Sequence, residues 1–175
     1  MPEVLVFSGP ALPLLDLSEQ IKPEGWNLHV RTSESSVDDV MSAAGVADFI
    51  LVCGHGVSDD VLRAARKTKL VQLCSAGFDG VNLELAGEMG IPVANNGGTN
   101  AVPVAEFAIT LTLAAIRHLV ITDSDTRAGN WMRPELDGRD SHELFGATVG
   151  IIGAGRIGST VAGMLRGFET TTLYT

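Results

Sequence analysis

Three glycines at a fixed spacing are the feature of this sequence that points most directly to chemistry. They lie in the segment Gly153-Ala154-Gly155-Arg156-Ile157-Gly158, which fits the pattern G-x-G-x-x-G. An apolar run precedes the motif and a helical pattern follows it. In this context Gly153 permits a tight turn, Gly155 lets the backbone approach a pyrophosphate, and Gly158 lets the helix pack against the strand. The motif therefore predicts a dinucleotide-binding turn.

The residues around and after the glycines complete part of that unit. The amides of Arg156 and Ile157 lie at the predicted helix N-terminus, where phosphates are favoured. A dinucleotide-binding unit also carries an acid about 20 residues further on, which binds the ribose hydroxyls. Leu173-Tyr174-Thr175 contains no acid, and the expected position is about the next one. The acid is therefore either missing or not used by this chain, and the sequence does not distinguish NAD from NADP. The alternative is a glycine turn that packs helix on strand and binds no ligand.

The elements that must position this motif alternate between strands and helices. Seven apolar, β-branched runs are predicted as strands: 4–7, 28–30, 49–52, 70–73, 91–94, 148–152 and 171–174. The segment 59–66, acidic at its start and basic at its end, is typical of the helices between them. A long helix is predicted from Ala101 to about Ile121, and 123–143 is predicted as a polar surface connection. This alternation predicts an α/β fold with parallel sheets.

Charge and composition exclude several classes of partner. The sequence has 12 Lys and Arg against 21 Asp and Glu, a net charge of −9, which disfavours nucleic acid and anionic membrane surfaces. The N-terminus lacks the basic region of a signal peptide. The most apolar run, 107–116, is too short to span a bilayer. We therefore expect a cytoplasmic protein without a membrane partner.

The two cysteines, Cys53 and Cys74, have no C-x-x-C spacing and no nearby His partner in the sequence. Each lies inside or beside an apolar run, and we interpret both as buried thiols of a reducing compartment. No metal site is predicted from them.

Three segments together resemble the D-isomer-specific 2-hydroxyacid dehydrogenases, a family that includes phosphoglycerate dehydrogenase, glyoxylate reductase and formate dehydrogenase. They are 69–81 (KLVQLCSAGFDGV), 90–106 (GIPVANNGGTNAVPVAE) and 144–168, which contains the glycine motif. The match runs from about residue 45 onward, and the first 45 residues share only the strand–helix rhythm. The resemblance implies three parts: a flavodoxin-like parallel-sheet substrate domain over 1–100, an interdomain helix over 101–122 and an incomplete Rossmann NAD-binding domain over 123–175.

The resemblance also implies residues for substrate and cofactor. The amides of Ala76 and Gly77 would hold the carboxylate of a small 2-hydroxy or 2-keto acid. Asn100 would lie near the nicotinamide of NAD or NADP. The implied activity is hydride transfer between that nicotinamide and the hydroxy acid, by an oxidoreductase that acts on CH–OH. A homodimer through 101–121 and the NAD-binding domain is expected as well.

The sequence departs from the family in the residues that carry the reaction. The family's catalytic Arg, Glu and His come from segments beyond the first strand–helix–strand unit, and these 175 residues contain no such segments. No catalytic residue is predicted, and we expect the 175-residue chain to be inactive by itself. The alternative function is a non-catalytic nucleotide-binding or scaffold module. A receiver-like signalling domain is disfavoured, because Ser8-Gly9-Pro10 lacks the acidic cluster that such domains need.

Smaller departures concern single positions. Among the four histidines, His55 is the one candidate for a position near a cleft, but a solvated loop histidine is the favoured interpretation. Phe107 stands where the family often has His, and Glu169 stands where a turn glycine is usual, so we expect an altered bend there. Uncovered apolar faces and an unpaired strand edge predict that residues 145–175 are loosely held unless a partner covers them.

Overall fold

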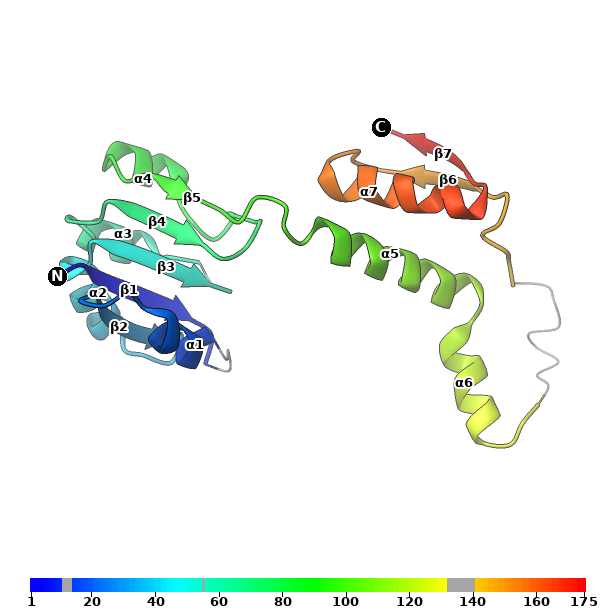
Figure 1. The fold of residues 1–175 in the computed structure, drawn as a ribbon, viewed down its shortest axis with the longest axis horizontal. Helices are drawn as coiled ribbons and strands as arrows, with labels where there is room; N and C mark the ends of the chain where they lie inside the picture. Colours follow the sequence, from blue (N-terminus) through cyan, green and yellow to red (C-terminus); the bar gives the residue numbers. More distant parts are fainter. Residues whose placement is uncertain (11–13, 55, 132–140) are drawn as a thin grey trace. The chain divides into compact units, whose positions relative to one another are not determined.

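The computed structural model describes residues 1–10, 14–54, 56–131 and 141–175 (Figure 1). Two compact units divide the described chain, Met1–Gly97 and Gly98–Thr175. The first contains β1 (Glu3–Ser8), α1 (Leu14–Ile21), β2 (Asn27–Thr32), α2 (Val37–Val46), β3 (Phe49–Cys53), α3 (Asp59–Ala64), β4 (Leu70–Leu73), α4 (Leu83–Glu88) and β5 (Val93–Ala94). The second contains α5 (Ala101–Ile116), α6 (Leu119–Arg127), β6 (Thr148–Ile151), α7 (Arg156–Leu165), the 3-10 turn η2 (Arg166–Phe168) and β7 (Thr171–Tyr174).

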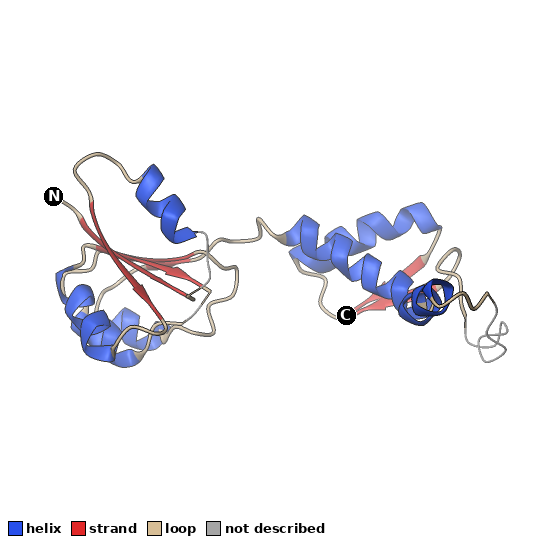
Figure 2. Cartoon of the chain, turned by 90° about the horizontal axis from the view of Figure 1, so that it is seen from below, coloured by secondary structure: helices blue, strands red, loops and turns tan. Residues whose placement is uncertain are grey.

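The first unit is a parallel five-stranded sheet in the order β2-β1-β3-β4-β5. Helices lie on both faces of this sheet (Figure 2). The strand order is that of the flavodoxin-like folds, so the predicted fold class is confirmed. Parallel strands covered on both faces bury consecutive residues, which explains why the apolar runs in the sequence lack a strict alternation.

The core of the first unit lies where the inner strands meet the helices. Leu5, Ile50 and Val71 come from β1, β3 and β4 and are at most 1% exposed. Leu62 of α3 packs into the same cluster. The helices begin where polar side chains accept hydrogen bonds from first-turn amides, as Ser36, Ser58 and Asn82 do for α2, α3 and α4.

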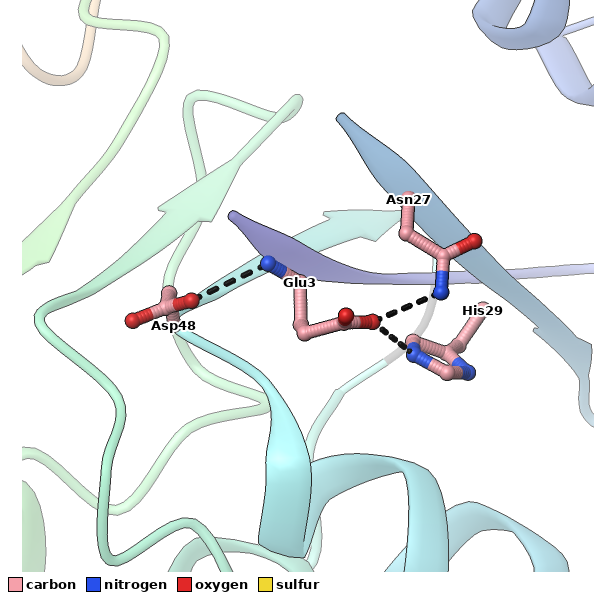
Figure 3. Close-up of polar contacts among 4 residues, drawn as sticks. All are labelled: Glu3, Asn27, His29 and Asp48. Atoms are coloured by element: carbon pink, nitrogen blue, oxygen red, sulfur yellow. Dashed lines mark hydrogen bonds and ion pairs between the residues drawn. The ribbon is translucent and has the colours of Figure 1, made fainter. Parts of the chain in front are cut away.

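Polar side chains tie the amino-terminal ends of the strands in the first unit together (Figure 3). Glu3 Oε2 accepts a hydrogen bond from Asn27 Nδ2 at 2.8 Å and lies 2.6 Å from His29 Nε2. Asp48 accepts from the Glu3 amide at 3.0 Å and pairs with Lys69 Nζ at 2.8 Å. Hydrogen bonds from His29 and Asn27 hold the pKa of the Glu3 carboxyl below its ordinary value of 4.5. We call Glu3, Asn27, His29, Asp48 and Lys69 the edge cluster.

The second unit begins with helix α5, which runs alongside α7 (Figure 1). Its two strands, β6 and β7, pair in parallel, with Thr148 opposite Thr171 and Ile151 opposite Tyr174. Helix α7 connects them, so this part of the chain is the strand–helix–strand unit predicted from the glycine motif. Neither strand contains a buried residue.

The predicted long helix is broken, and the prediction of one helix to about Ile121 is wrong. Helix α5 ends at Ile116, and α6 begins after His118, which adopts a left-handed conformation with φ 52°. The carbonyl of Ile116 accepts a hydrogen bond from the amide of His142. In a continuous helix the Ile116 carbonyl would accept a hydrogen bond from the amide four residues further along the chain. Here the amide of His142, distant in the sequence, donates to it instead.

The polar segment after the break also differs from its prediction. Residues 123–127 are part of α6 and not of a surface connection. Asp123 and Arg127, one turn apart, form an ion pair at 2.8 Å, which favours helix at this spacing. No single described helix is long and apolar enough to cross a bilayer; α5 and α6 reach that length only together, and they are bent by 64° at their junction.

Two strand ends and one turn show the effect of single residues. The strand predicted over 91–94 is reduced to Val93–Ala94, because Pro92 has no amide to donate to a ladder; its carbonyl still accepts from Val71. The first strand of the glycine unit ends at Ile151, one residue earlier than predicted. Glu169 has φ 54°, so the turn keeps the left-handed conformation that a glycine would favour.

Candidate functional site

The glycine motif forms a tight turn between β6 and α7. Gly153 has φ 90°, a conformation that side chains with a Cβ rarely adopt. A Cβ on Gly158 would collide with the Gly153 carbonyl and lie 3.2 Å from Ile151 Cγ2. The first glycine therefore makes the turn, and the last one lets α7 approach the strand. The space above Gly155 is open, because a Cβ there would meet no atom within 4 Å.

Helix α7 begins at Arg156 with Gly155 as its cap residue. The Ser159 amide bonds to the Gly155 carbonyl at 2.9 Å. The amides before Ser159 precede the first intrahelical bond of α7, and a helix N-terminus favours negative charge. A hollow of about 480 Å³ extends from this turn along α7 as far as Arg166, and its lining includes the last residues of β6 and β7 as well as Gly158 and Gly163.

The entrance of α5 lies beside the same turn. A Cβ on Gly98 would collide with the side chain of Arg156, so the Arg156 side chain lies directly against the Gly98 backbone. Asn100 is the cap residue of α5, but its side chain is exposed and makes no capping hydrogen bond. The second unit thus places Gly98, two residues before Asn100, against Arg156 of the glycine motif. Glycine at 98 is a positional requirement that the sequence reasoning did not identify.

The loop after β4 in the first unit is fixed by hydrogen bonds that its carbonyl groups accept. Asn95 Nδ2 donates to the Ala76 carbonyl at 2.7 Å, and Ser75 Oγ donates to the Gly77 carbonyl at 2.8 Å. The Asn96 amide donates to the Ser75 carbonyl at 2.9 Å. Because these bonds hold the carbonyls, the orientation of the peptide groups in the loop is set. No acceptor among the described residues bonds the amides of Ala76 and Gly77.

A hollow of about 330 Å³ adjoins this loop. It lies where the segments after β3 and β4 meet, and it is lined by Gly54, Gly56, Ser75, Gly77, Asp79, Gly80 and Val81. The close approach of these segments depends on glycine, because a Cβ on Gly56 would collide with the Gly80 carbonyl. Among the described residues the lining has no cation, and Asp79 contributes a carboxylate.

Asn95 and Asn96 are residues that the sequence reasoning did not single out for a role. Two asparagines directly after a strand are nevertheless a signal for side chains that bond nearby backbone. Their bonds cross from the end of β5 to the loop after β4. The sequence cannot show this, because the partners are about 20 residues apart.

Several other candidates have different surroundings from those predicted. His55 lies outside the described residues. The interpretation as buried thiols is confirmed for Cys53 but wrong for Cys74, which is only half-buried. The two Sγ atoms lie 2.8 Å apart. Phe107 is 60% exposed. Across the described ranges, no group of three or more His, Cys, Asp or Glu side chains is arranged to hold a metal ion.

Known proteins share both the sequence pattern and the fold. Residues 4–173 match the sequence profile of the family described as "D-isomer specific 2-hydroxyacid dehydrogenase, catalytic domain". The D-3-phosphoglycerate dehydrogenase of Mycobacterium bovis is 33% identical over 165 residues, which cover 90% of this chain and 31% of that protein. The hydroxypyruvate reductase of Thermotoga maritima is 32% identical over 151 residues, which cover 86% of this chain and 48% of that protein.

Among solved structures, the D-lactate dehydrogenase of Aquifex aeolicus in complex with NAD and lactic acid has a TM-score of 0.81 at 25% identity. The similarity covers 98% of this chain and 50% of that one. The chain therefore spans between about a third and a half of the length of these relatives. The profile match begins at residue 4, so the similarity extends further toward the N-terminus than the sequence segments alone indicated.

Proposed function

Because this chain belongs to the D-isomer-specific 2-hydroxyacid dehydrogenase family, we propose that it provides substrate-binding and NAD-binding parts of such an oxidoreductase. The proposed reaction transfers hydride between a nicotinamide and a small 2-hydroxy or 2-keto acid. Bound NAD would supply the hydride acceptor for oxidation of the hydroxy acid. The roles of this chain's own residues are to bind the cofactor's phosphates and the carboxylate of the acid.

The observation that carries the proposal is the geometry of the β6–α7 turn. Gly153 adopts φ 90°, Gly158 leaves no room for a Cβ, and the space above Gly155 is open. A glycine turn that only packs helix on strand would need the first and third of these features but not an open second glycine. The amides at the start of α7, including those of Arg156 and Ile157, would then bind the pyrophosphate. Asn100, at the adjoining entrance of α5, would lie toward the nicotinamide.

In the first unit, the amides of Ala76 and Gly77 would bind the substrate carboxylate. They adjoin the hollow after β3 and β4, and the bonds from Asn95 and Ser75 hold the loop in one conformation. We accordingly assign residues 1–100 to substrate binding, 101–122 to the connection between the parts and 123–175 to cofactor binding. The division into two compact units, Met1–Gly97 and Gly98–Thr175, supports this assignment of roles. The ligand-binding experiments below test it.

The 175-residue chain alone is proposed not to catalyse the hydride transfer. The lining of the substrate hollow contains a carboxylate, Asp79, and no cation among the described residues. An anionic acid held by two amides beside a carboxylate binds weakly, because nothing compensates its charge. Hydride transfer also needs a general acid–base at the hydroxyl oxygen, and no residue of this chain is assigned that role.

The first experiment is a calorimetric titration of the purified chain with NAD and, separately, with NADP. Binding of NAD is expected, and it should weaken at least tenfold in Gly158→Ala but not in the control Gly87→Ala, which lies in α4 of the first unit and where a Cβ has open space. Binding of neither nucleotide would contradict the cofactor assignment. Binding without turnover would also fit a non-catalytic nucleotide-binding module, and only the substrate experiment separates the two.

The second experiment follows the backbone amides of the chain by NMR during a titration with glyoxylate. We expect the signals of Ala76 and Gly77 to shift at millimolar concentrations, and Asn95→Ala to abolish these shifts while Asn130→Ala leaves them unchanged. NADH consumption with glyoxylate or hydroxypyruvate should be absent. A rate that scales with the amount of purified chain would overturn the proposed inactivity.

We further propose that the chain forms a homodimer and works in the cytoplasm. Three apolar side chains of α5 support the dimer, because Val104, Phe107 and Leu111 are 38%, 60% and 53% exposed. Sedimentation equilibrium should give twice the chain mass, and Phe107→Asp should give the monomer. A monomeric wild-type chain at tens of micromolar would contradict the dimer.

A further inference from the structure

Two cysteines lie at the carboxyl ends of β3 and β4, directly before the loops that line the substrate hollow. Cys53 is the last residue of β3, and Cys74 is the first residue after β4. Val52 pairs with Leu73 in the parallel ladder, and the Cys74 amide donates to the Val52 carbonyl at 2.8 Å. The two cysteines therefore occupy the next position along the same register. Their Sγ atoms are 2.8 Å apart.

The backbone at this position already has the spacing that a disulfide requires. Neighbouring strands lie about 4.7–4.9 Å apart, and disulfides form across Cα separations of about 4.4–6.8 Å. The sulfur atoms are further apart than the roughly 2.05 Å of an S–S bond, so both residues are thiols in this structure.

The two thiols differ in their access to solvent. Cys53 is 1% exposed, whereas Cys74 is half-buried. Burial, together with the hydrogen bond to Cys74, raises the pKa of the Cys53 thiol to about 12. Cys53 consequently remains protonated at neutral pH, and an oxidant from solvent reaches Cys74 first.

We propose that Cys53 and Cys74 form an oxidation site that hydrogen peroxide converts to an intramolecular disulfide. In the first step the Cys74 thiolate attacks a peroxide oxygen, the O–O bond breaks, and a sulfenic acid and hydroxide form. In the second step the Cys53 sulfur attacks the Cys74 sulfur, the S–O bond breaks, and water leaves with the Cys53 proton. The two sulfurs together lose two electrons, and the peroxide is reduced to water. A dithiol reductant reverses the reaction by thiol–disulfide exchange.

The disulfide would act on the loop that follows Cys74. Asn96 Nδ2 donates to the Cys74 carbonyl at 3.3 Å, and the next residues are the loop with the Ala76 and Gly77 amides. Joining the ends of β3 and β4 fixes the start of this loop. We therefore expect oxidation to change the affinity for glyoxylate at least threefold. This consequence rests on the proposed function, whereas formation of the disulfide does not.

The test uses the full chain, which has no other cysteine. The protein is treated with a small excess of hydrogen peroxide, denatured and alkylated with N-ethylmaleimide. Mass spectrometry then measures the mass of the intact chain. We expect the mass to fall by two hydrogens with no alkylation, and dithiothreitol to restore two alkylated thiols. Methionine oxidation adds oxygen and is distinguished by its mass. Two alkylated thiols after peroxide, a sulfinic acid on Cys74, or a disulfide between chains would each overturn the proposal.

Two single variants test the order of the steps. Cys53→Ser should accumulate a Cys74 sulfenic acid that dimedone traps, because the second sulfur is missing. Cys74→Ser should keep an unreacted Cys53 thiol under the same conditions, since that sulfur is buried. Equal dimedone labelling of the two variants would contradict the assigned order. Should a variant not fold, the wild-type mass experiment still decides whether the disulfide forms. If it forms without changing the glyoxylate titration, the oxidation site stands and only its coupling to the loop fails.

Discussion

At the residue scale, glycines determine the backbone geometry of the candidate cofactor site. Gly153 and Gly98 are required for their backbone conformations, with φ 90° and 93°, while Gly158 is required by its contact with the Gly153 carbonyl. These are different physical requirements, and they predict different responses to substitution. A close contact with backbone is the most costly to accommodate, because neither partner has a side chain that can rotate away.

We predict that Gly158→Ala destabilises the second unit by about 1–3 kcal/mol. The added Cβ would collide with the Gly153 carbonyl, so α7 has to move away from β6. Urea unfolding followed by circular dichroism measures the change. Gly163→Ala in the same helix is the control, and it should stabilise by about 0.5–1 kcal/mol, because alanine favours helix and the site has open space. Equal effects of the two substitutions would show that the close approach at 158 is not important.

Glu169 provides the opposite case, a side chain at a position that favours glycine. Its φ of 54° is left-handed, which costs about 1–2 kcal/mol in residues with a Cβ. We predict that Glu169→Gly raises the free energy of unfolding by about 0.5–1 kcal/mol, after the entropy of glycine in the unfolded chain is offset. The thermal midpoint should rise accordingly. The comparison variant Glu106→Gly, in the interior of α5, should lower the free energy of unfolding by about 0.5–1 kcal/mol and lower the thermal midpoint.

At the element scale, the two ends of the parallel strands in the first sheet have different tasks. The carboxyl ends lead into the hollow and the loop with the Ala76 and Gly77 amides. The amino ends are joined by the edge cluster, which ties β1 to β2 and to the residues before β3 and β4. We interpret the edge cluster as structural, because the hollow and the loop amides lie at the other end of the strands.

The edge cluster predicts a dependence of stability on pH. The folded protein lowers the pKa of Glu3 from 4.5, chiefly through the hydrogen bond from His29, and lowers that of Asp48 from 3.8, chiefly through Lys69. A carboxyl whose pKa is lower in the folded state contributes stability above its unfolded pKa and loses it as the pH falls through the folded value. We therefore expect the unfolding free energy to decrease below about pH 4.5.

The matching variant is Glu3→Gln, compared with Glu24→Gln at an exposed carboxylate. Glu3→Gln should be less stable than wild type at pH 7, and the difference should shrink as the pH is lowered toward 3. Glu24→Gln should follow the wild-type curve. Denaturant titrations at several pH values measure both. A difference for Glu3→Gln that stays constant from pH 7 to pH 3 would mean that this carboxyl does not titrate differently on folding.

At the scale of the whole molecule, the two compact units differ in how well they are covered. Each inner strand of the first sheet contains at least two buried residues, whereas β6 and β7 contain none. Ile152, Leu173 and Tyr174 are 94%, 59% and 75% exposed. Such surface is uncommon on an isolated soluble domain, so we expect it to be covered in the functional protein.

This difference predicts unequal protection from hydrogen exchange. In the isolated chain the amides of Val149–Ile152 should exchange much faster than those of β1 and β3, because few buried contacts oppose local opening. Hydrogen exchange with mass spectrometry or NMR measures both groups in one sample. Protection over Val149–Ile152 as strong as in β3 would refute the prediction that residues 145–175 are loosely held.

Most elements could be predicted because their signals are local. Every predicted strand is present, and the glycine motif lies between a strand and a helix as expected. The errors occur where distant residues intervene. At the helix break the amide of His142 bonds the Ile116 carbonyl, and no pattern near residue 116 contains that information. The contact between Cys53 and Cys74 likewise depends on the order of strands in the sheet.

The sequence by itself determined the family, the α/β class and the positions of the glycine turn, because each depends on residue types at short, fixed spacings. Only the tertiary structure decided which groups meet across those spacings. It tied the loop carbonyls to Asn95 and Asn96, opened the space above Gly155 and brought two thiols together. The physical reason is that a backbone amide, a carbonyl or a thiol acquires its function from the partner it faces, and strand order and register select that partner.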